Sequence, residues 1–242
     1  MRRLALLLLL LTVLPAKAQT RVALELVLAV DVSTSIDQSE FRLQRIGLFR
    51  AFRDPGVRAS ILAQPNGIAV ALVQWAGKGR QRVAIDWHHA HDDSSIDALA
   101  RRIGGMQRLT GGFTDIAGAV RFSTRMLLEN DYRGDRLVID VSGDGVADQG
   151  SPPTARDEAV ALGITVNGLA IFPQEYDLGA LADQQLFDHY RRDVTGGIAS
   201  FVITAKSFED FPRAMREKLI REISGPAFSR LRSRSTEGNG AL

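Results

Sequence analysis

The sequence predicts an α/β protein with a Rossmann-like, doubly wound sheet that is mostly parallel and covered by helices on both faces. The first observation is that apolar, strand-like runs alternate with segments of helical periodicity along most of the chain, the order typical of such sheets. The second is a pair of strand-like runs, residues 67–76 and 80–87, joined by a short glycine turn. This spacing predicts a hairpin, so residues 80–87 are expected to run antiparallel to the strand before them.

The first elements have the clearest patterns. Residues 22–32 (VALELVLAVDV) form an apolar run that suits a buried strand. Residues 38–53 place apolar side chains close to the spacing of a helix face, and the DPG sequence at 54–56 is expected to end that helix. Residues 67–76 (GIAVALVQWA) contain few polar breaks, as expected of a strand that is covered on both faces.

The rest of the chain continues the alternation as far as residue 223. Ser207 is expected to cap the last helix, because the acidic residues Glu209 and Asp210 follow it. The remaining expected strands are 135–141, 164–171 and 200–204, and the remaining expected helices are 94–103, 116–129, 154–162, 178–192 and 207–223.

This order of elements brings three polar loops to one end of the sheet. If the carboxyl end of the first strand is called the top, each parallel strand ends at the top and each following helix returns to the bottom. Asp31, Ser33 and Ser35 then lie at the top, as do the loops that carry Thr114 and Asp144. Open α/β sheets bind ligands at this edge, in the crevice outside the carboxyl ends of the strands.

The candidate side chains in these loops carry only oxygen ligands. Asp31, Ser33 and Ser35 alternate along an extended chain and would point to one side, where Thr114 and Asp144 also lie. Carboxylates and hydroxyls suit a hard cation, and Mg²⁺ takes about six oxygen ligands while retaining waters. These five residues therefore predict a Mg²⁺ site, with Mn²⁺ and Ca²⁺ as alternatives. Taken singly, the serines could instead be helix caps and Asp144 a turn residue.

The same three stretches resemble a known family. DVSTS (residues 31–35) resembles the D-x-S-x-S signature of the von Willebrand factor A domain, GGFTD (111–115) resembles its threonine loop, and VIDVSGDG (138–145) resembles its strand ending in Asp-Gly. In that family these motifs make up a metal-ion-dependent adhesion site. The resemblance covers about residues 22–223, and the SGDG form with a secretory signal is most similar to a group of secreted, uncharacterised bacterial members.

The resemblance implies a sheet with strand order 3-2-1-4-5-6 and the antiparallel third strand at its edge. It implies that Ser33 and Ser35 bind the metal directly and that Thr114 binds it directly or through water. Asp31 and Asp144 would act mainly through waters or hydrogen bonds, and the last coordination position would be open to an Asp or Glu of a partner protein. The implied function is metal-dependent protein binding of the adhesion type, without catalysis. Phe113, a bulky residue directly before Thr114, departs from the family pattern.

The first 18 residues have the features of a secretory signal peptide. Two arginines precede about eleven mostly apolar residues, and Ala16 and Ala18 are the small residues expected before a cleavage site. The apolar run is short for a membrane span, which needs about 20 residues, and no later stretch is long enough. We therefore expect a signal peptide at 1–18, a periplasmic or secreted domain at 19–223 and a disordered tail at 224–242.

Charge and cysteine content exclude several functions. The chain has 30 Lys and Arg against 28 Asp and Glu, but removal of residues 1–18 leaves 27 against 28, a net charge of about −1. A protein this close to neutral has no electrostatic basis for binding nucleic acid. The chain contains no cysteine, which excludes thiolate metal sites and cysteine nucleophiles.

Other functions remain as alternatives. A hydrolase could use Ser33 or Ser35, but neither lies in a G-x-S-x-G motif, and His189 is expected at the far end of a descending helix. A metal-assisted phosphate or nucleotide binder is another alternative, although the chain lacks the G-x-x-x-x-G-K-[ST] motif. HHAHDD (residues 88–93) is expected to be an exposed loop at the bottom, with zinc binding as its alternative. PQEYD (173–177) is expected at the top, as a border of the site or an ordinary polar loop.

Overall fold

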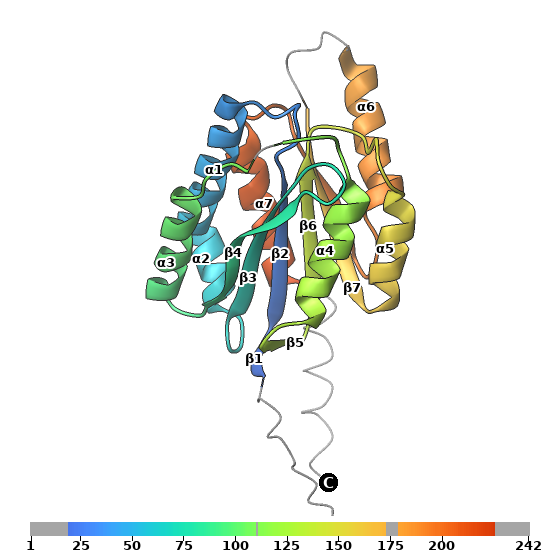
Figure 1. Ribbon diagram of the computed structural model, residues 1–242. Helices are drawn as coiled ribbons and strands as arrows, with labels where there is room; N and C mark the ends of the chain where they lie inside the picture. The colour runs from blue at the N-terminus through green and yellow to red at the C-terminus, as the bar shows by residue number, and fades with distance from the viewer. Residues whose placement is uncertain (1–18, 110, 173–178, 226–242) are drawn as a thin grey trace, which may run out of the picture.

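A six-stranded sheet forms the centre of the part of the protein that the structure, a computed structural model, describes: residues 19–109, 111–172 and 179–225. Its strands run in the order β4-β3-β2-β6-β7-β8 (Figure 1). β4 pairs antiparallel with β3, and the other neighbouring pairs of this sheet are parallel. The predicted fold class is confirmed, including the strand order and the antiparallel edge strand. The strands are β2 (Leu24–Asp31), β3 (Ile68–Trp75), β4 (Gln81–Ala90), β6 (Leu137–Gly143), β7 (Ile164–Ile171) and β8 (Val202–Ala205).

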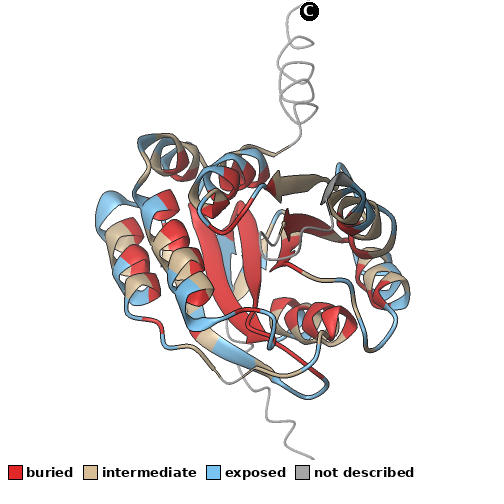
Figure 2. Ribbon diagram, turned by 90° about the horizontal axis from the view of Figure 1, so that it is seen from above, coloured by how far each residue is buried: buried red, intermediate tan, exposed pale blue. Residues whose placement is uncertain are grey.

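Helices cover both faces of this sheet, as predicted, and the strands between them are buried (Figures 1 and 2). The two layers meet different sets of strand side chains and so form two apolar cores. One layer contains α1 (Gln38–Arg53), α2 (Pro55–Leu62), α3 (Asp93–Gly104) and α7 (Phe211–Ser224). The other contains α4 (Ile116–Leu128), α5 (Pro152–Ala161) and α6 (Gly179–His189) with its π-helical continuation η1 (Tyr190–Val194).

Strand β2 lies in the middle of the sheet and contributes to both cores. Leu26 and Leu28 pack in the core below α1 and α7, whereas Val27 and Ala29 pack in the core below α4 and α5. Every residue of β2 is buried. A parallel strand covered on both faces needs apolar side chains at odd and even positions, which explains the nearly unbroken apolar run.

The DPG sequence ends α1, as predicted, but it also begins the unpredicted helix α2. The Asp54 carboxylate accepts hydrogen bonds from Gly56 N (2.8 Å) and Val57 N (3.3 Å), which have no partner within the helix. Pro55 occupies the first helical turn, where its missing N–H is not needed. An Asp-Pro pair therefore signals the start of a helix as well as the end of the preceding one.

A second, two-stranded sheet was not predicted. The run expected as one strand at 22–32 divides into β1 (Thr20–Val22) and β2. β1 pairs in parallel with β5 (Tyr132–Gly134), more than a hundred residues away. Strands of three residues carry too little periodicity to be recognised before their partner is known.

The last helix begins later than predicted. α7 starts at Phe211, with Asp210 as N-cap and Pro212 in the first turn. Ser207 instead closes a short turn before the helix, since its carbonyl and hydroxyl oxygens accept hydrogen bonds from Asp210 N (3.2 and 3.4 Å). Pro212 explains the position of the start, because proline is tolerated in the first turn of a helix but not in its interior.

Three predicted segments lie outside the described residues: the signal peptide at 1–18, residues 226–242 of the tail, and the loop with Glu175, Tyr176 and Asp177. Among the helices that are described, none combines the length and the apolar composition that crossing a membrane requires.

Candidate metal centre

The two predicted aspartates lie at the carboxyl ends of neighbouring strands. Asp31 is the last residue of β2, and Asp144 directly follows Gly143, the last residue of β6. β2 and β6 pair in parallel, so both carboxylates lie at the same edge of the sheet. Both side chains are buried. The two aspartates therefore lie together at the edge of the sheet, as their positions after parallel strands predict.

The loop that carries Thr114 is hydrogen-bonded to both other loops. Gly112 O accepts hydrogen bonds from Thr34 N (2.9 Å) and from the Thr34 hydroxyl (3.1 Å). On its other side, Thr114 N donates to Asp148 Oδ1 (2.9 Å), in the loop that follows Asp144. Gly111 allows the close approach, because a Cβ at this position would lie only 2.7 Å from Val32 O.

Three of the five predicted side chains form a connected set of oxygen atoms, and a fourth, Asp31, is joined to it through a backbone N–H. The Ser33 and Ser35 hydroxyls are hydrogen-bonded to each other (3.0 Å), and Ser35 Oγ donates to Asp144 Oδ1 (2.8 Å). Asp31 Oδ1 accepts a hydrogen bond from Ser33 N (2.7 Å). Thr114 lies in the same group of loops, but its hydroxyl makes no hydrogen bond to another described residue. The metal-binding role of these five residues stays a prediction.

Burial leaves the two carboxylates poorly compensated. Desolvation, followed by repulsion from Asp144, raises the pKa of Asp31 to about 8. Burial also raises the pKa of Asp144, and the hydrogen bond from Ser35 offsets part of that effect. Asp31 Oδ2 has no hydrogen-bond partner among the residues that the structure describes. A buried, unsatisfied carboxylate oxygen beside a second buried carboxylate is the situation that a bound cation relieves.

The donor set fits a hard divalent cation. It consists of carboxylate and hydroxyl oxygens, with no nitrogen or sulfur ligand. The orphaned Asp31 Oδ2 supplies an acceptor that the protein's own donors leave free. A cation could therefore be bound here without breaking a hydrogen bond at that oxygen.

Helix capping does not explain Ser33 and Ser35. The N-cap of α1 is Asp37, whose Oδ1 accepts from Ser39 N (2.6 Å) and Glu40 N (2.8 Å). Glu40 Oε2 in turn accepts from Asp37 N (2.7 Å), which completes a capping box. Asp37 thus accepts hydrogen bonds from backbone N–H groups at the start of α1, so the two serines are not needed there. Their hydroxyls bond within the oxygen cluster instead.

Phe113 lies at the rim of the site and faces solvent. Its side chain is 66% exposed, so it does not pack beneath the loop. Its backbone lies against the β3–β4 hairpin, where a Cβ at Gly77 would be 3.0 Å from Phe113 N. The departure from the family pattern therefore adds an apolar side chain to the exposed surface beside Thr114.

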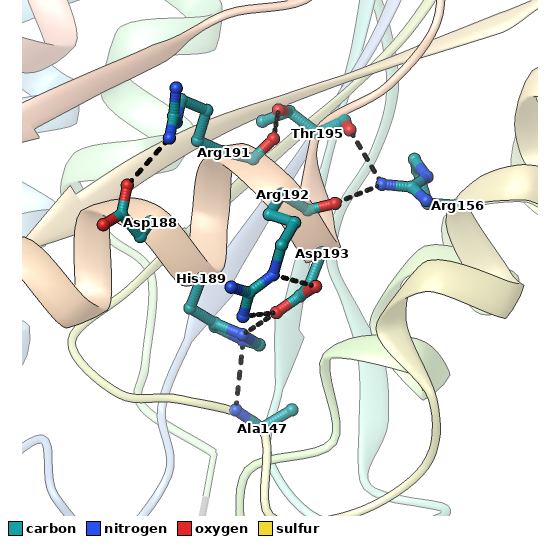
Figure 3. Close-up of polar contacts among 8 residues, drawn as sticks. All are labelled: Ala147, Arg156, Asp188, His189, Arg191, Arg192, Asp193 and Thr195. Carbon is teal, nitrogen blue, oxygen red and sulfur yellow. Dashed lines mark hydrogen bonds and ion pairs between the residues drawn. The ribbon is translucent and has the colours of Figure 1, made fainter.

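The expected position of His189 was wrong. It lies near the candidate centre, because Ala147 N in the loop after Asp144 donates to His189 Nε2 (3.3 Å; Figure 3). The predicted position requires a helix that starts level with the top of the sheet and reaches its bottom. α6 instead rises well above the carboxyl edge of the strands, so that its C-terminal end is still close to that edge (Figure 1).

This position does not make His189 a catalytic base for Ser33 or Ser35. Its Nδ1 is paired with Asp193 Oδ2 (2.9 Å), and its Nε2 lone pair already accepts the Ala147 N–H. No hydrogen bond joins His189 to either serine in the described part of the chain. A general base needs a free nitrogen within hydrogen-bond reach of the nucleophile, so the hydrolase alternative gains no support.

Two histidines of the HHAHDD stretch are hydrogen-bonded to backbone carbonyls. His88 and His89 belong to the end of β4, which is longer than predicted. His88 Nε2 is bonded to Ser95 O and His89 Nε2 to Asn66 O (2.7 Å each). Nowhere in the described ranges do three or more His, Cys, Asp or Glu side chains gather in a way that could hold a metal. The candidate centre at Asp31 is of another kind, since hydroxyls make up three of its five predicted ligands.

Three further residues lie against the predicted site residues and were not predicted from the sequence. Arg108 Nη2 donates to Ser33 O (3.2 Å) and to Ile36 O, which ties the 33–36 loop to the chain before α4. Asp148 holds Thr114 N, as described above. Tyr190 approaches Asp31 from η1. Asp148 could have been suspected from its place four residues after Asp144, but nothing in the sequence pattern marks Arg108 or Tyr190.

Solved structures with the same fold include proteins of surfaces and matrices. The pilus adhesin SpaC from Lactobacillus rhamnosus GG has a TM-score of 0.59 and 14% identity, over 83% of this chain and 30% of SpaC. Proximal thread matrix protein 1 from the mussel byssus, with a zinc-occupied MIDAS motif, has a TM-score of 0.60 and 16% identity, over 85% of this chain and 49% of that protein. The vWF domain of the type V pili tip protein Mfa5 from Porphyromonas gingivalis has a TM-score of 0.52 and 12% identity, over 83% and 97%.

At these identities the likeness shows the fold alone, and this chain spans less than half the length of SpaC and of the byssus protein. No curated protein matches the sequence. Residues 21–227 match a family model described as "Protein of unknown function (DUF1194)". The chain therefore belongs to the DUF1194 family, and its fold is that of the von Willebrand factor A domain.

Proposed function

We propose that this protein is an exported, metal-dependent protein-binding module of the adhesion type. Ser33, Ser35 and Thr114 would hold a Mg²⁺ ion, and Asp31 and Asp144 would support it through waters or hydrogen bonds. An Asp or Glu of a partner protein would complete the coordination. The observation that carries the proposal is the connected oxygen cluster of Ser33, Ser35 and Asp144, beside the buried, unpartnered Asp31 Oδ2.

The charge of the cluster favours an acidic partner. If hydroxyls are the direct ligands, they leave the charge of the cation largely uncompensated in its first shell. A carboxylate from outside would then bind strongly, because charge-assisted contacts to a partly buried cation are not screened as surface ion pairs are. The exposed ring of Phe113 beside the site offers an apolar contact to the residues around that carboxylate.

The comparisons support this proposal at the level of the fold and its usual site. One protein of the same fold binds zinc in its MIDAS motif, and another is a pilus adhesin. These are properties of those proteins. For this chain they favour a divalent cation at the corresponding motif and a binding role rather than catalysis.

Export follows from the predicted signal peptide at residues 1–18. We propose a periplasmic or secreted location, with a mature chain that begins at Gln19. Mass spectrometry of the protein isolated from cells tests this directly. A full-length protein that keeps residues 1–18 and stays with the inner membrane would contradict the proposed export and cleavage.

The metal test is thermal unfolding of the purified protein in Mg²⁺, in Mn²⁺ and in chelator. Either cation should raise the unfolding temperature of the wild type. The double variant Ser33→Ala/Ser35→Ala should lose that increase, whereas Ser94→Ala, which replaces an exposed serine on α3, should keep it. If the wild type unfolds at the same temperature under all three conditions, the proposed metal binding is wrong.

The partner test is capture from a native envelope extract with Mg²⁺, with chelator, and with Mg²⁺ restored. A specific partner should bind only when the cation is present and should be lost from the serine double variant. Replacing one Asp or Glu of that partner by Asn or Gln should abolish capture. The phosphate-binding alternative would be favoured if inorganic phosphate abolishes capture and every such substitution in the partner leaves capture unchanged.

A further inference from the structure

Tyr190 has a buried hydroxyl that nothing in the fold explains. Its side chain is fully buried, and its hydroxyl has no hydrogen-bond partner among the described residues. Leaving a buried hydroxyl unpaired costs about 1–3 kcal/mol, and buried tyrosines usually find a partner. The residue opens η1, a single π-helical turn, and such turns are frequent at functional sites.

Two glycines make the space that Tyr190 occupies. Gly143 ends β6 and Gly168 lies on the neighbouring strand β7. A Cβ on Gly168 would lie 2.8 Å from Tyr190 Cδ1, and a Cβ on Gly143 would lie 2.8 Å from the Tyr190 hydroxyl. The ring therefore lies over β7, and its hydroxyl end reaches β6 at the edge of the candidate metal centre.

The hydroxyl of Tyr190 and the orphaned oxygen of Asp31 border the same small space. The Cβ that Gly143 lacks would lie 2.7 Å from Asp31 Oδ2, on the strand next to β6. Asp31 Oδ2 is an acceptor without a donor, and the Tyr190 hydroxyl is a donor without an acceptor. The two unsatisfied groups are thus complementary, and the missing side chain of Gly143 leaves space beside both of them.

The segment that carries Tyr190 is held firmly from two sides (Figure 3). Arg156 of α5 donates through Nη1 to Arg192 O (2.8 Å) and Thr195 O (3.2 Å), which are carbonyls at the end of η1. His189, the residue before Tyr190, accepts a hydrogen bond from Ala147 N in the Asp144 loop. These contacts fix the direction of the tyrosine relative to that loop.

We propose that Tyr190 is a positioning residue of the metal centre, whose hydroxyl donates to Asp31 Oδ2, directly or through one water, when the cation is bound. Ser33 N already holds Oδ1, so the tyrosine would fix the second oxygen and with it the plane of the carboxylate. This inference rests on the proposed metal-binding function. Removing a group that orients a ligand or its support typically lowers metal affinity about 10- to 100-fold.

The test is Tyr190→Phe, which removes one oxygen atom and keeps the ring. In isothermal titration, the Mn²⁺ dissociation constant should rise about tenfold or more relative to the wild type. In chelator, the unfolding temperature should stay the same or rise, because an unpaired buried hydroxyl is lost. Tyr132→Phe is the matched control: Tyr132 packs against Trp87 in another part of the fold, and its variant should change neither quantity.

A spectroscopic readout follows the hydroxyl itself. Binding of Mn²⁺ should give a near-ultraviolet tyrosine difference band in the wild type and in Tyr132→Phe, but not in Tyr190→Phe. Gly143→Ala provides a second variant, because its Cβ would lie 2.7 Å from Asp31 Oδ2 and 2.8 Å from the Tyr190 hydroxyl and would push the two oxygens apart. It should weaken Mn²⁺ binding to a similar degree, and it keeps the proposal testable if Tyr190→Phe does not fold.

The outcomes separate this inference from the function on which it rests. A wild type that binds no Mn²⁺ would overturn the proposed function. If the wild type binds Mn²⁺ but Tyr190→Phe or Gly143→Ala binds it equally tightly, the proposed role of Tyr190 is wrong. The proposed metal-binding function would then still hold. A Tyr190→Phe protein that is destabilised equally with and without metal would show a purely structural role and would also overturn the inference.

Discussion

The Ser35 hydroxyl donates a 2.8 Å hydrogen bond to Asp144 Oδ1, although 109 positions separate the two residues in the sequence. The bond connects the loop after β2 with the loop after β6, two neighbouring parallel strands. It orients an oxygen of each loop toward the same point. The pairing of β2 with β6 therefore brings the loops of the candidate centre together. Single substitutions can test what each residue contributes to metal binding.

Asp31→Asn should have opposite effects with and without metal. The asparagine keeps an oxygen for the hydrogen bond from Ser33 N but removes a buried charge that Asp144 repels. At pH 8 in chelator, we expect the variant to unfold at the same temperature as the wild type or higher. In Mg²⁺ the variant should be the less stable protein, because it loses the stabilisation that metal binding gives the wild type. This stabilisation is about 2.7 kcal/mol when the Mg²⁺ concentration is 100 times the dissociation constant.

Differential scanning calorimetry of both proteins in Mg²⁺ and in chelator measures these two effects, with Ser94→Ala as the control. A variant that gains as much from Mg²⁺ as the wild type would show that Asp31 takes no part in metal binding.

The stability of the metal-free protein should fall as the pH rises. Burial and Asp144 raise the pKa of Asp31 from 3.8 to about 8, and burial and Glu222 raise that of Asp140 to about 7. The folded protein therefore keeps protons that the unfolded chain has released above pH 3.8. Their stabilising contribution is fully present below that value and is lost as the pH rises through about 7 to 8.

Mg²⁺ should reverse part of this trend, because a cation favours the ionised carboxylate. Mg²⁺ should raise the unfolding temperature relative to chelator, and this increase should become larger between pH 5 and pH 8. That pH range ends at the raised pKa of Asp31. Asp31→Asn should flatten this difference while keeping the Asp140 contribution in chelator. A difference that does not vary with pH in the wild type would contradict the coupling between Asp31 and the metal.

Long regular elements were predictable because their periodicity is local. The bounds expected for α1 and β7 agree with the structure, and the hairpin turn at Gly77 and Gly79 correctly indicated the antiparallel strand. α2 was missed because one Asp-Pro pair serves two helices. β1 and β5 were missed because each is stabilised by a partner that is remote in the sequence.

The site was predictable to the extent that it depends on strand direction. Parallel strands end at one edge, so Asp31 and Asp144 had to lie close together once β2 and β6 were neighbours. The position of Tyr190 depends on the height at which α6 stands over the sheet and on a π-helical turn, neither of which leaves a pattern in the sequence. The same reason explains the wrong placement of His189.

Lys218 should be essential for stability, away from the metal centre. It is fully buried on α7 and forms ion pairs with Asp140 (2.9 Å) and Glu222 (2.5 Å). Lys218→Met would leave two buried carboxylates without their cation, which typically costs about 3–5 kcal/mol. Urea unfolding measures the loss, and Arg121→Met, which breaks the exposed pair with Glu158, should change the midpoint little. Equal, small effects of both variants would mean that the carboxylates are protonated or otherwise compensated.

Gly111→Ala and Gly112→Ala should differ sharply although the residues are neighbours. A Cβ on Gly111 would lie 2.7 Å from Val32 O, a backbone atom directly after β2 that cannot move aside. A Cβ on Gly112 would meet Arg80 Cδ at 3.1 Å, and a flexible exposed side chain yields at little cost. Gly111→Ala should therefore displace the Thr114 loop, whereas Gly112→Ala should leave it in place.

The displacement should matter for metal binding, because backbone contacts of this loop position Thr114 beside the other predicted ligands. We expect Gly111→Ala to weaken Mn²⁺ binding about tenfold or more, as the loss of an oriented ligand does. Gly112→Ala should bind Mn²⁺ as the wild type does, and isothermal titration of the three proteins measures the difference. Equal affinities for all three would show that the threonine loop is not part of the metal centre, because its register against β2 would then have no effect on binding.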